Sequence, residues 1–501
     1  MLLSRPSRRF DKSSMNLTDP ILRHARMQPH AAALIDRERT ITFSALADIV
    51  MRTAGHLAAL GVGRGDQVGL CLKDDWQHVV ALLAVIRLGA VAVQMDWRSR
   101  PAEKARIANA LAPKLIVVLP GSSFAAPCPS VAVDRAWDSC VAAAKPMTDA
   151  PQDWQAPAAV LASSGTTGLP KFMLATHLQL YLHCAVSHEV VPTTRRHRCL
   201  ITLPLYFSAG RMRCLAHLMR GDTLILYPSL FTAAEFVEVV NRDKVTASFV
   251  VPSAVRQLLP IAGESKPIFP QLDVFVCSGS PLFADEKRAA LRSLSSNFYE
   301  VYGNTAIGGL SVLRPADITE RPTSVGRPFS LVDVEVVDDD DRPVGTETLG
   351  RLRCRGPGLT SPIPGLNDRS AAEDFREGWH YPGDVAALDE FGYIYLHGRT
   401  SDVIFRGGAK IFPAEVEAVL QGHQAVAEAV VVGSASSNHQ QELIAYVVAR
   451  RELAPGELLA YCRTQLTAYK VPRDIHIVSE LPRNSSGKPD RRALLQHDRG
   501  S

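Results

Sequence analysis

The sequence has no run of about eighteen apolar residues, the length that a membrane-spanning helix requires. Its N-terminal stretch, MLLSRPSRRF, also lacks the apolar core of a secretory signal. Both absences favour a cytoplasmic protein without a membrane span. Residues 1–14 are expected to form a flexible, solvated tail ahead of Met15.

The sequence also lacks an excess of charge of one sign. Lysine and arginine number 55, aspartate and glutamate number 51, and the formal net charge is only +4, so no nucleic acid partner is indicated. The nine cysteines include no CxxC pair, which disfavours zinc sites and a disulfide framework. With 46% hydrophobic and 21% charged residues over 501 positions, the composition favours a soluble globular enzyme of several structural units.

The glycine-rich fingerprint of dinucleotide-binding proteins is absent from the place where it belongs. Residues 68–120 alternate strand-like and helix-like patterns and predict a βαβαβ unit. The turn after its first strand reads KDDW instead of GxGxxG. A nicotinamide-dependent enzyme is therefore disfavoured.

The rest of the chain continues the α/β pattern and then changes texture twice. A second alternating set ends at Gly303, so two α/β halves are predicted. Short strands with turn residues follow from about residue 320 and predict a β subdomain. Its four consecutive acids, Asp338 to Asp341, are interpreted as a hairpin turn and not as a metal site.

After Arg399 the pattern becomes α+β, with a helix that is expected to begin at Pro413. The predicted fold class is therefore α/β, with a large N-terminal domain over residues 15–399 and a small, mobile α+β domain over residues 400–501. The N-terminal domain combines the two α/β halves with the β subdomain.

The stretch SSGTTGLPK, residues 163–171, has the composition of a phosphate-binding loop but not the spacing of a Walker loop. A Walker loop reads GxxxxGK followed by Ser or Thr, whereas Lys171 follows Gly168 by three positions and Phe172 comes next. Glycine backbone N–H groups, hydroxyl groups and a lysine nevertheless suit phosphate oxygens. Taken alone, the stretch is also compatible with a polar surface loop.

Five further stretches give this loop a context. They are CSGSPL (277–282), YGNTAIGG (302–309), YPGD (381–384), GRTSDVIFRGGAKIFPAEVE (398–417) and PRNSSGKPDR (482–491). Together with SSGTTGLPK they resemble the ordered motifs of the adenylate-forming superfamily, which includes acyl- and aryl-CoA synthetases, firefly luciferase and the adenylation domains of peptide synthetases. The resemblance runs from about residue 20 to residue 495 and comprises six motifs in order.

The resemblance implies an ATP site. Asp384 matches the aspartate that accepts hydrogen bonds from the ribose hydroxyls, and Arg399 matches the arginine that contacts ribose and phosphate. The residues implied to hold the pyrophosphate are Ser163, Ser164, Gly165, Thr166, Thr167, Gly168 and Lys171. Those implied around the adenine and the remaining nucleotide are Ser278, Gly279, Ser280, Pro281, Tyr302, Gly303, Asn304 and Thr305.

The resemblance also implies the catalytic groups. Lys488 matches the lysine that bridges the substrate carboxylate and the α-phosphate, with Lys171 and Thr167 acting beside it. An ammonium suits this role because attack of an anionic carboxylate on an anionic phosphate concentrates negative charge. In the family the C-terminal domain then rotates, so that Gly407 and Gly408 replace Lys488 at the site. The pivot falls at Ser401, where relatives usually carry Asp or Lys.

Two departures from the family pattern bear on activity. Ala306 stands where the family has a glutamate that helps to hold Mg²⁺, so only Thr167 is left as an expected protein ligand, and weaker metal affinity or a slower first step is expected. Phe207 stands where many relatives have a histidine beside the acyl pocket. The expected pocket is apolar and roomy, and its residues are Phe207, Ser208, Ala209, Gly210, Gly303, Gly308 and Gly309.

Such a pocket favours a bulky aromatic, alicyclic or medium-chain acid. Arg211 and Arg213 follow at once and have two interpretations. They read a second carboxylate on the substrate or, as the commoner case predicts, they face solvent or pair with nearby acids.

The sequence therefore predicts a carboxylate–CoA ligase that uses ATP, Mg²⁺ and coenzyme A to activate a small-molecule carboxylic acid. A catalytically weak nucleotide- or acyl-binding homologue is the alternative that Ala306 and Phe207 favour. A donor of the acyl-adenylate to a carrier protein is a further alternative. The sequence leaves open whether the protein is a monomer or a homodimer.

Overall fold

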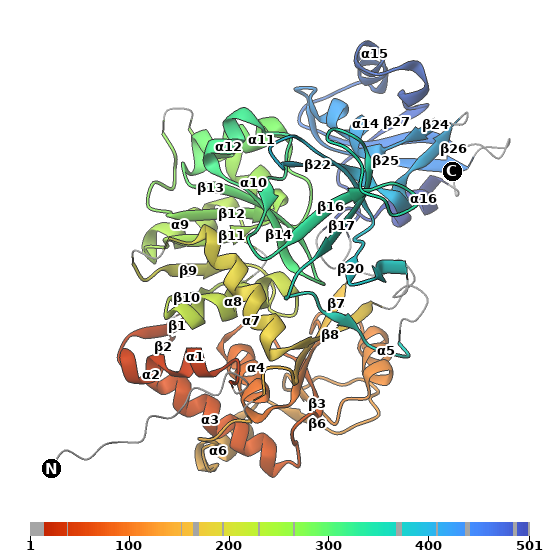
Figure 1. The fold of residues 1–501 in the computed structure, drawn as a ribbon. Coiled ribbons are helices and arrows are strands. Elements are labelled where there is room, and N and C mark those ends of the chain that lie inside the picture. Colours follow the sequence, from red (N-terminus) through yellow and green to blue (C-terminus); the bar gives the residue numbers. More distant parts are fainter. Residues whose placement is uncertain are drawn as a thin grey trace.

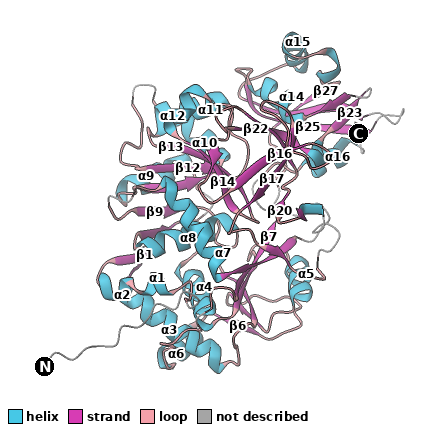
Figure 2. Ribbon diagram, viewed as in Figure 1, coloured by secondary structure: helices cyan, strands magenta, loops and turns pink. Residues whose placement is uncertain are grey.

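The computed structural model describes residues 15–37, 39–151, 153–163, 170–192, 195–228, 231–263, 266–366, 373–406, 409–435, 441–483 and 488–498. Figures 1 and 2 show two large sheets with helices around them and a smaller unit, blue in Figure 1, that contains the C-terminus. Within the described ranges no helix is long and apolar enough to cross a membrane. All nine cysteines are free.

The first large sheet has seven strands in the order β18-β8-β7-β4-β3-β5-β6. Strands β7, β4, β3, β5 and β6 run parallel, whereas β8 and β18 are antiparallel to their neighbours. The strands are β3 (Gln67–Cys71), β4 (Val91–Gln94), β5 (Leu115–Val118), β6 (Ser130–Ala132), β7 (Pro157–Ser163), β8 (Lys171–Thr176) and β18 (Ser361–Pro362). Its helices are α3 (Phe43–Ala59), α4 (Trp76–Leu88), α5 (Pro101–Leu111) and α6 (Arg135–Ala143).

Helix α4 illustrates how local sequence sets these elements. The Asp75 side chain caps its N-terminus by accepting from the backbone N–H groups of Gln77 and His78. The helix ends at Gly89, whose φ of 76° favours glycine. Every residue from His78 to Leu88 is buried, because the helix packs on β3 and β4 of one sheet and on β1 of the other.

The second large sheet has nine strands in the order β15-β14-β13-β12-β11-β9-β10-β1-β2, and the six from β13 to β1 are parallel. The strands are β1 (Ala32–Asp36), β2 (Arg39–Thr42), β9 (Arg198–Ile201), β10 (Thr223–Leu226), β11 (Ala247–Val250), β12 (Val274–Ser278), β13 (Phe298–Asn304), β14 (Gly308–Leu313) and β15 (Arg327–Pro328). Its helices include α1 (Asp19–Leu22), α2 (His24–Met27), α9 (Ala233–Arg242), α10 (Pro252–Leu258), α11 (Ala284–Ala289) and α12 (Pro315–Glu320).

Helices α7 (His177–Ser187) and α8 (Ser208–Arg220) lie in the middle of the molecule (Figure 2). Helix α7 contacts β7 and β8 of the seven-stranded sheet and also β14 of the nine-stranded sheet, and α8 packs against α7, β9 and β10. Residues on these two helices are therefore buried from both sides. This layer connects the two halves into one core.

The third sheet has six strands, β16 (Asp333–Val337), β17 (Gly350–Arg355), β19 (Phe375–Arg376), β20 (Trp379–His380), β21 (Asp384–Leu388) and β22 (Ile394–Arg399). The predicted turn between β16 and β17 is present. The Asp338 carboxylate accepts from the backbone N–H groups of Asp340 and Arg342, each at 2.9 Å, and Asp341 pairs with Arg351. The acids of this run therefore cap a turn and neutralise arginines.

The C-terminal unit contains β23 (Ile404–Arg406), β24 (Ala409–Ile411), α14 (Pro413–Gln421), β25 (Val426–Ala435), β26 (Gln441–Ala449), α15 (Pro455–Gln465), β27 (Asp474–Val478) and α16 (Arg491–Asp498). Strands β25, β26 and β27 form a sheet with its own apolar core. Pro413 is the first residue of α14, as predicted. The arrangement of all these elements confirms the predicted α/β class with a small α+β unit at the C-terminus.

Candidate active site

The predicted site residues lie where parallel strands of the two large sheets end. Strand β12 ends at Ser278, β13 ends at Asn304 and β7 ends at Ser163, and the segment after β9 leads to Phe207. In open α/β sheets the loops at the carboxyl ends of the strands form the binding crevice. The β21–β22 hairpin and Lys488 reach the same region from the third sheet and from the C-terminal unit.

Asp384 is the centre of this region. It is the first residue of β21 and is paired in register with Arg399, the last residue of β22. The Arg399 Nε lies 3.2 Å from one carboxylate oxygen, and the Tyr302 hydroxyl donates to the other at 2.5 Å. The Asp384 side chain is only 11% exposed. Burial, together with the Asp384 charge, raises the pKa of Tyr302 well above its ordinary value, so the phenol stays a donor.

These contacts fix the position of the Asp384 carboxylate and leave some of its lone pairs free to accept further hydrogen bonds. An ionised carboxylate offers about four lone-pair positions, and the two neighbours occupy two of them. The remaining positions are suited to a pair of adjacent hydroxyl groups. A carboxylate held by an arginine and a tyrosine is therefore a preorganised acceptor.

Lys488 joins this cluster from the C-terminal unit. It precedes α16, next to a β-bridge between Arg483 and Pro489. Burial lowers the pKa of the Lys488 ammonium, the Arg399 charge lowers it further, and the Asp384 charge opposes both. Three segments far apart in the sequence thus bring a tyrosine, a carboxylate and a guanidinium into contact, with the Lys488 ammonium near enough to interact electrostatically with Asp384 and Arg399.

The loop of the SSGTTGLPK motif connects two antiparallel strands. Ser163 and Lys171 are paired in register as the last residue of β7 and the first of β8. A Walker loop instead leads from a strand into a helix N-terminus, so the topology independently excludes one here. The intervening predictions, Ser164, Gly165, Thr166, Thr167 and Gly168, lie outside the described residues, as does the side chain of Ser163.

Lys171 forms an ion pair with Asp374, which lies 203 residues later. Backbone contacts hold the acid in turn, because the Asp374 carbonyl accepts from the Tyr381 N–H at 2.7 Å and lies 3.1 Å from the His380 ring. No sequence motif contains Asp374, and sequence reasoning missed it.

The segment after β12 forms the next part of the region. Gly279 has a φ of 108°, which a side chain would disfavour, and Ser280 is half-buried. The Pro281 carbonyl accepts from Arg256, which also pairs with Glu286 at 2.6 Å. Arg256 reaches Glu428 of the C-terminal unit at 3.4 Å, so this segment is tied to the unit that carries Lys488.

The turn between β13 and β14 contains the remaining nucleotide predictions. The Asn304 side-chain oxygen accepts from the N–H groups of Ala306 and Ile307, at 2.9 and 3.2 Å, and Thr305 is half-buried beside them. Gly303 is required here, because a Cβ atom would lie 2.2 Å from the carbonyl oxygen of Gly308.

Ala306 is only 2% exposed and is part of the apolar core. The N–H and hydroxyl of Thr360 both donate to its carbonyl at 2.9 Å, which fixes the backbone. The position of the missing glutamate is therefore a packed one in this chain. Among the described residues no group of three His, Cys, Asp or Glu side chains is placed to hold a metal ion.

The residues of the expected acyl pocket make close contacts with their neighbours. Phe207 packs on Tyr206 with ring centroids 4.2 Å apart, Ser208 is half-buried and Ala209 is exposed. A Cβ atom at Gly210 would meet the Pro204 carbonyl at 2.3 Å.

A Cβ atom at Gly308 would lie 3.1 Å from the His183 ring, and one at Gly309 would lie 2.9 Å from the Phe329 ring. The glycines at these positions therefore allow close packing of their neighbours, and the acyl pocket stays a prediction.

The two arginines after Phe207 are also placed differently from the commoner expectation. Arg211 is 1% exposed and Arg213 is largely buried, so neither faces solvent. Neither forms an ion pair with a described acid. The Arg213 guanidinium stacks over the Phe249 ring at 4.2 Å from its centroid.

Ser401 lies in a short 3₁₀ turn, Thr400–Asp402, directly after Arg399, and its side chain is exposed. Its hydroxyl donates to Asp402 at 2.8 Å. Gly407 and Gly408 lie outside the described residues. Ser401 is thus at the surface, and its role as a hinge stays a prediction.

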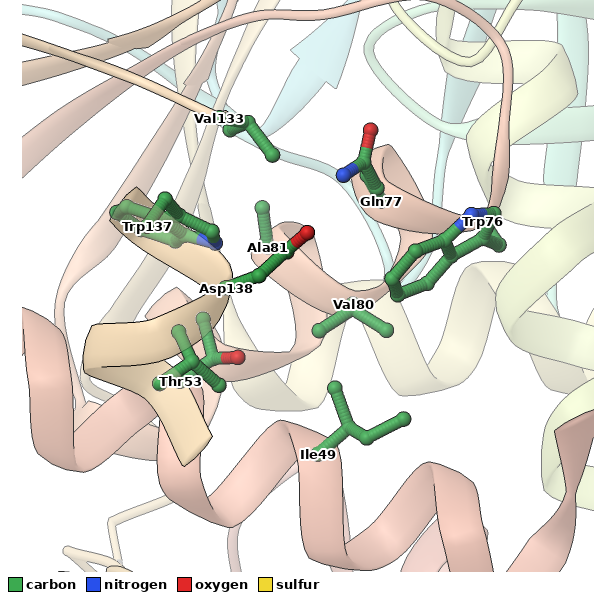
Figure 3. Close-up of a pocket in the computed structure, with 10 residues that line it drawn as sticks. Ile49, Thr53, Trp76, Gln77, Val80, Ala81, Val133, Trp137 and Asp138 are labelled. Carbon is green, nitrogen blue, oxygen red and sulfur yellow. The ribbon is translucent and has the colours of Figure 1, made fainter. Parts of the chain in front are cut away.

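A small pocket between α3, α4 and α6 lies apart from this region (Figure 3). Trp76, Trp137 and Val80 are among its mainly apolar lining residues. None of the predicted site residues lines it, and Arg39 covers the Trp76 ring at 3.9 Å. We interpret it as a packing gap between helices.

Comparison with known proteins identifies the family. The model of the AMP-binding enzyme family matches residues 21–362, and that of the AMP-binding enzyme C-terminal domain matches residues 415–488. A feruloyl-CoA synthase from Amycolatopsis sp. is 31% identical over 93% of this chain and 96% of its own length. A fatty acid–[acyl-carrier-protein] ligase from Streptomyces coeruleorubidus is 29% identical over 94% of each chain.

Solved structures of similar fold include o-succinylbenzoate CoA synthetase from Bacillus subtilis. In complex with the acyl-adenylate intermediate OSB-AMP it is 26% identical with a TM-score of 0.86, covering 96% of this chain and 98% of its own. In complex with ATP and magnesium ion it is also 26% identical, with a TM-score of 0.85 and coverages of 95% and 99%.

Proposed function

This chain belongs to the AMP-binding enzyme family as an AMP-forming acyl-CoA synthetase, and we propose how its own residues carry the reaction. A carboxylate oxygen attacks the α-phosphorus of ATP, which forms an acyl-adenylate and releases pyrophosphate. The sulfur of coenzyme A then attacks the acyl carbon, which forms the thioester and releases AMP and the thiol proton.

One observation carries this proposal. Tyr302, Asp384, Arg399 and Lys488 come from three separate parts of the chain and lie together. The buried carboxylate would accept from the two ribose hydroxyls, and Arg399 would contact the ribose and the phosphate. The Asp384 carboxylate is largely buried, and burying a carboxylate is costly unless it is paired or used.

Lys488 would act on the first step. A partly desolvated ammonium stabilises the negative charge that develops between the carboxylate and the α-phosphate. Lys171 would hold the departing pyrophosphate, and to do so its ammonium must exchange Asp374 for phosphate oxygens. Rotation about Ser401 would then carry Lys488 away and bring Gly407 and Gly408 towards the thiol, between a domain over 15–399 and one over 400–501.

The magnesium ion of Mg-ATP would receive few ligands from the described residues of this protein. Ala306 offers no carboxylate, and Thr167, which the family resemblance assigns to the metal, lies outside the described residues. Magnesium commonly keeps several waters and binds substrate phosphates, with one or two protein ligands. When bound, the ion neutralises phosphate charge, and the residues present are compatible with that role.

A carrier-protein thiol is a second candidate acceptor, because one relative is a ligase that charges an acyl-carrier protein. The first half-reaction would be identical. Thioester formation with free coenzyme A or with a phosphopantetheinyl carrier separates the two. The cytoplasmic location and the oligomeric state stay predictions.

The test is acid-dependent release of pyrophosphate from Mg-ATP across a panel of aromatic, alicyclic, aliphatic and dicarboxylic acids, with and without coenzyme A. The proposal expects multiple turnover only with the thiol. Asp384→Asn should raise the KM for ATP, whereas Asp333→Asn, an exposed partner of Arg355 on the same sheet, should not. An unchanged KM in the Asp384 variant contradicts the proposed ribose contact.

A further inference from the structure

Arg211 is a buried cation that the fold does not pair. It lies in the first turn of α8, four residues after Phe207, and only 1% of it is exposed. Its Nη1 lies 3.4 Å from the Tyr206 carbonyl, which is long for a hydrogen bond, and its Nε has no partner. Among the described residues no carboxylate forms an ion pair with it.

Such a group destabilises the folded state. An unpaired buried charge costs several kcal/mol, and an apolar side chain of similar volume is often more stable at such a place. Burial lowers the pKa of Arg211 to about 10, so the guanidinium still carries its charge at neutral pH. The folded protein therefore holds a desolvated positive charge that none of its own described groups neutralises.

Two other buried cations among the described residues form ion pairs. The Lys287 ammonium lies 2.5 Å from Glu300, and Arg87 lies 2.7 Å from Asp19. Arg213, two residues further along α8, stacks over the Phe249 ring. Among the described residues Arg211 has neither an ion pair nor an aromatic ring against its guanidinium, so a counter-ion for it would come from a bound molecule.

The surroundings of Arg211 lead to the predicted acyl pocket. Its charge is close enough to His183 and His78 to add to the lowering of their pKa values, which burial mainly causes. The Nε2 of His183 lies 2.8 Å from the Gly358 carbonyl, and its Nδ1 is buried without a partner. The same ring borders Gly308, one of the acyl-pocket predictions.

His183 offers a different kind of binding group from Arg211. Its pKa is lowered to about 4, so the ring is neutral near pH 7. With the proton on Nε2 for Gly358, Nδ1 is an acceptor that can take an N–H or O–H group. The pair thus offers one positive charge and one neutral acceptor.

We propose that Arg211 binds a second carboxylate of the acid substrate, at the end opposite the group that is activated, so that the enzyme acts on dicarboxylic acids. The inference rests on the proposed ligase function and names its substrate class. A guanidinium fork matches a planar carboxylate. A single positive charge beside a neutral histidine suits a monoanionic group better than a phosphate.

Matched pairs of acids test the proposal. Each pair is a dicarboxylic acid and the monocarboxylic acid in which a carboxamide replaces the distal carboxylate, in aliphatic and aromatic series of several lengths. The readout is kcat/KM for acid-dependent pyrophosphate release. The wild-type enzyme should prefer the dicarboxylic member of at least one pair by about 100-fold, the scale of losing one partner of a buried charged pair.

Arg211→Met should remove that preference by raising the KM of the dicarboxylic member, and Arg211→Lys should keep part of it. Arg213→Met is the matched control from the same helix and should change both members of a pair alike. Arg211→Met should also raise the Tm, because the substitution removes an unpaired buried charge. An arginine with a purely structural role would lower the Tm instead.

The outcomes separate the two proposals. If wild-type enzyme turns over monocarboxylic members as well as dicarboxylic ones, the ligase function stands and the inference fails. If no acid releases pyrophosphate, the ligase proposal fails, and thermal shift with the dicarboxylic acids decides the inference. Stabilisation of the wild type that Arg211→Met abolishes would support it, and no stabilisation would overturn it.

Discussion

Replacing Lys488 with methionine should separate the two half-reactions. Methionine keeps much of the length and apolar stem of lysine and removes only the ammonium. That ammonium interacts electrostatically with Arg399 and Asp384, and burial lowers its pKa. We expect adenylation to slow sharply, while transfer of the acyl group from a supplied acyl-adenylate to the thiol continues.

The magnitude follows from the surroundings. Two unit charges about 4 Å apart interact by about 4 kcal/mol at an effective dielectric constant of about 20, which is typical of partly buried sites. Only the part that exists in the transition state and not in the ground state accelerates the reaction. Removing one such electrostatic contact commonly costs about 3 kcal/mol, or about two to three orders of magnitude in kcat.

The assay measures pyrophosphate release from ATP and, separately, thioester formation from synthetic acyl-adenylate. Lys470→Met is a matched control, because that lysine belongs to the same C-terminal unit but pairs with Glu415 at 2.6 Å. The pH profile adds a second readout, since a lowered pKa means that Lys488 loses its proton at a lower pH than an ordinary lysine. Adenylation within threefold of wild type, or equal loss of both half-reactions, would refute the reasoning.

Three further predictions address the rest of the structure. The free energy of unfolding should fall by about 3 kcal/mol for each of His177, His183 and His380 as the pH drops from 6.5 to 4. The cause is that burial lowers the pKa of these histidines to about 4, so the unfolded chain binds the protons first. Denaturant titrations across that pH range measure the free energy, and a profile that does not change with pH would contradict the prediction. Glu428→Gln should slow adenylation about fivefold and leave thioester formation unchanged, because it weakens the ion pairs that hold the C-terminal unit in place. Equal effects on both steps would argue against this prediction. Ala306→Glu should lower the stability by about 2 kcal/mol because it buries a carboxylate, and should lower the Mg²⁺ requirement for adenylation; an unchanged requirement would mean that the ion is held elsewhere.

The fold class was predictable because it depends on local patterns. The run from Trp76 to Leu88 is apolar at helical spacing, Asp75 can cap it, and Gly89 can end it, and all three features appear in α4. Alternation of such helices with short apolar strands restricts the architecture to α/β. The pairing of β18 with β8 was not predictable, because residues 361 and 362 return to a strand almost 190 residues earlier without a sequence signal.

The site was predictable only where motifs mark it. Asp384 and Arg399 face each other because a hairpin pairs them, and the motif order indicated their shared role. Asp374, the partner of Lys171, lies in no motif and is placed by tertiary structure alone. The burial of Arg211 could not be predicted for the same reason. Helix α8 lies in a layer that is covered on two sides, whereas the hydrophobic pattern of a single helix indicates only one buried side.

The ion pair between the two parts of the chain bears on the proposed rotation of the C-terminal unit. Glu428 contacts Arg256 of the N-terminal part and Arg483 of its own unit. The contact that crosses between the parts is the longer of the two that Arg256 makes with acids, 3.4 Å against 2.6 Å to Glu286, so it is the weaker one. A stronger, fully buried network would hold Lys488 permanently at Asp384 and block the second half-reaction. A weaker one would leave the first half-reaction without its ammonium, so an intermediate strength serves both steps.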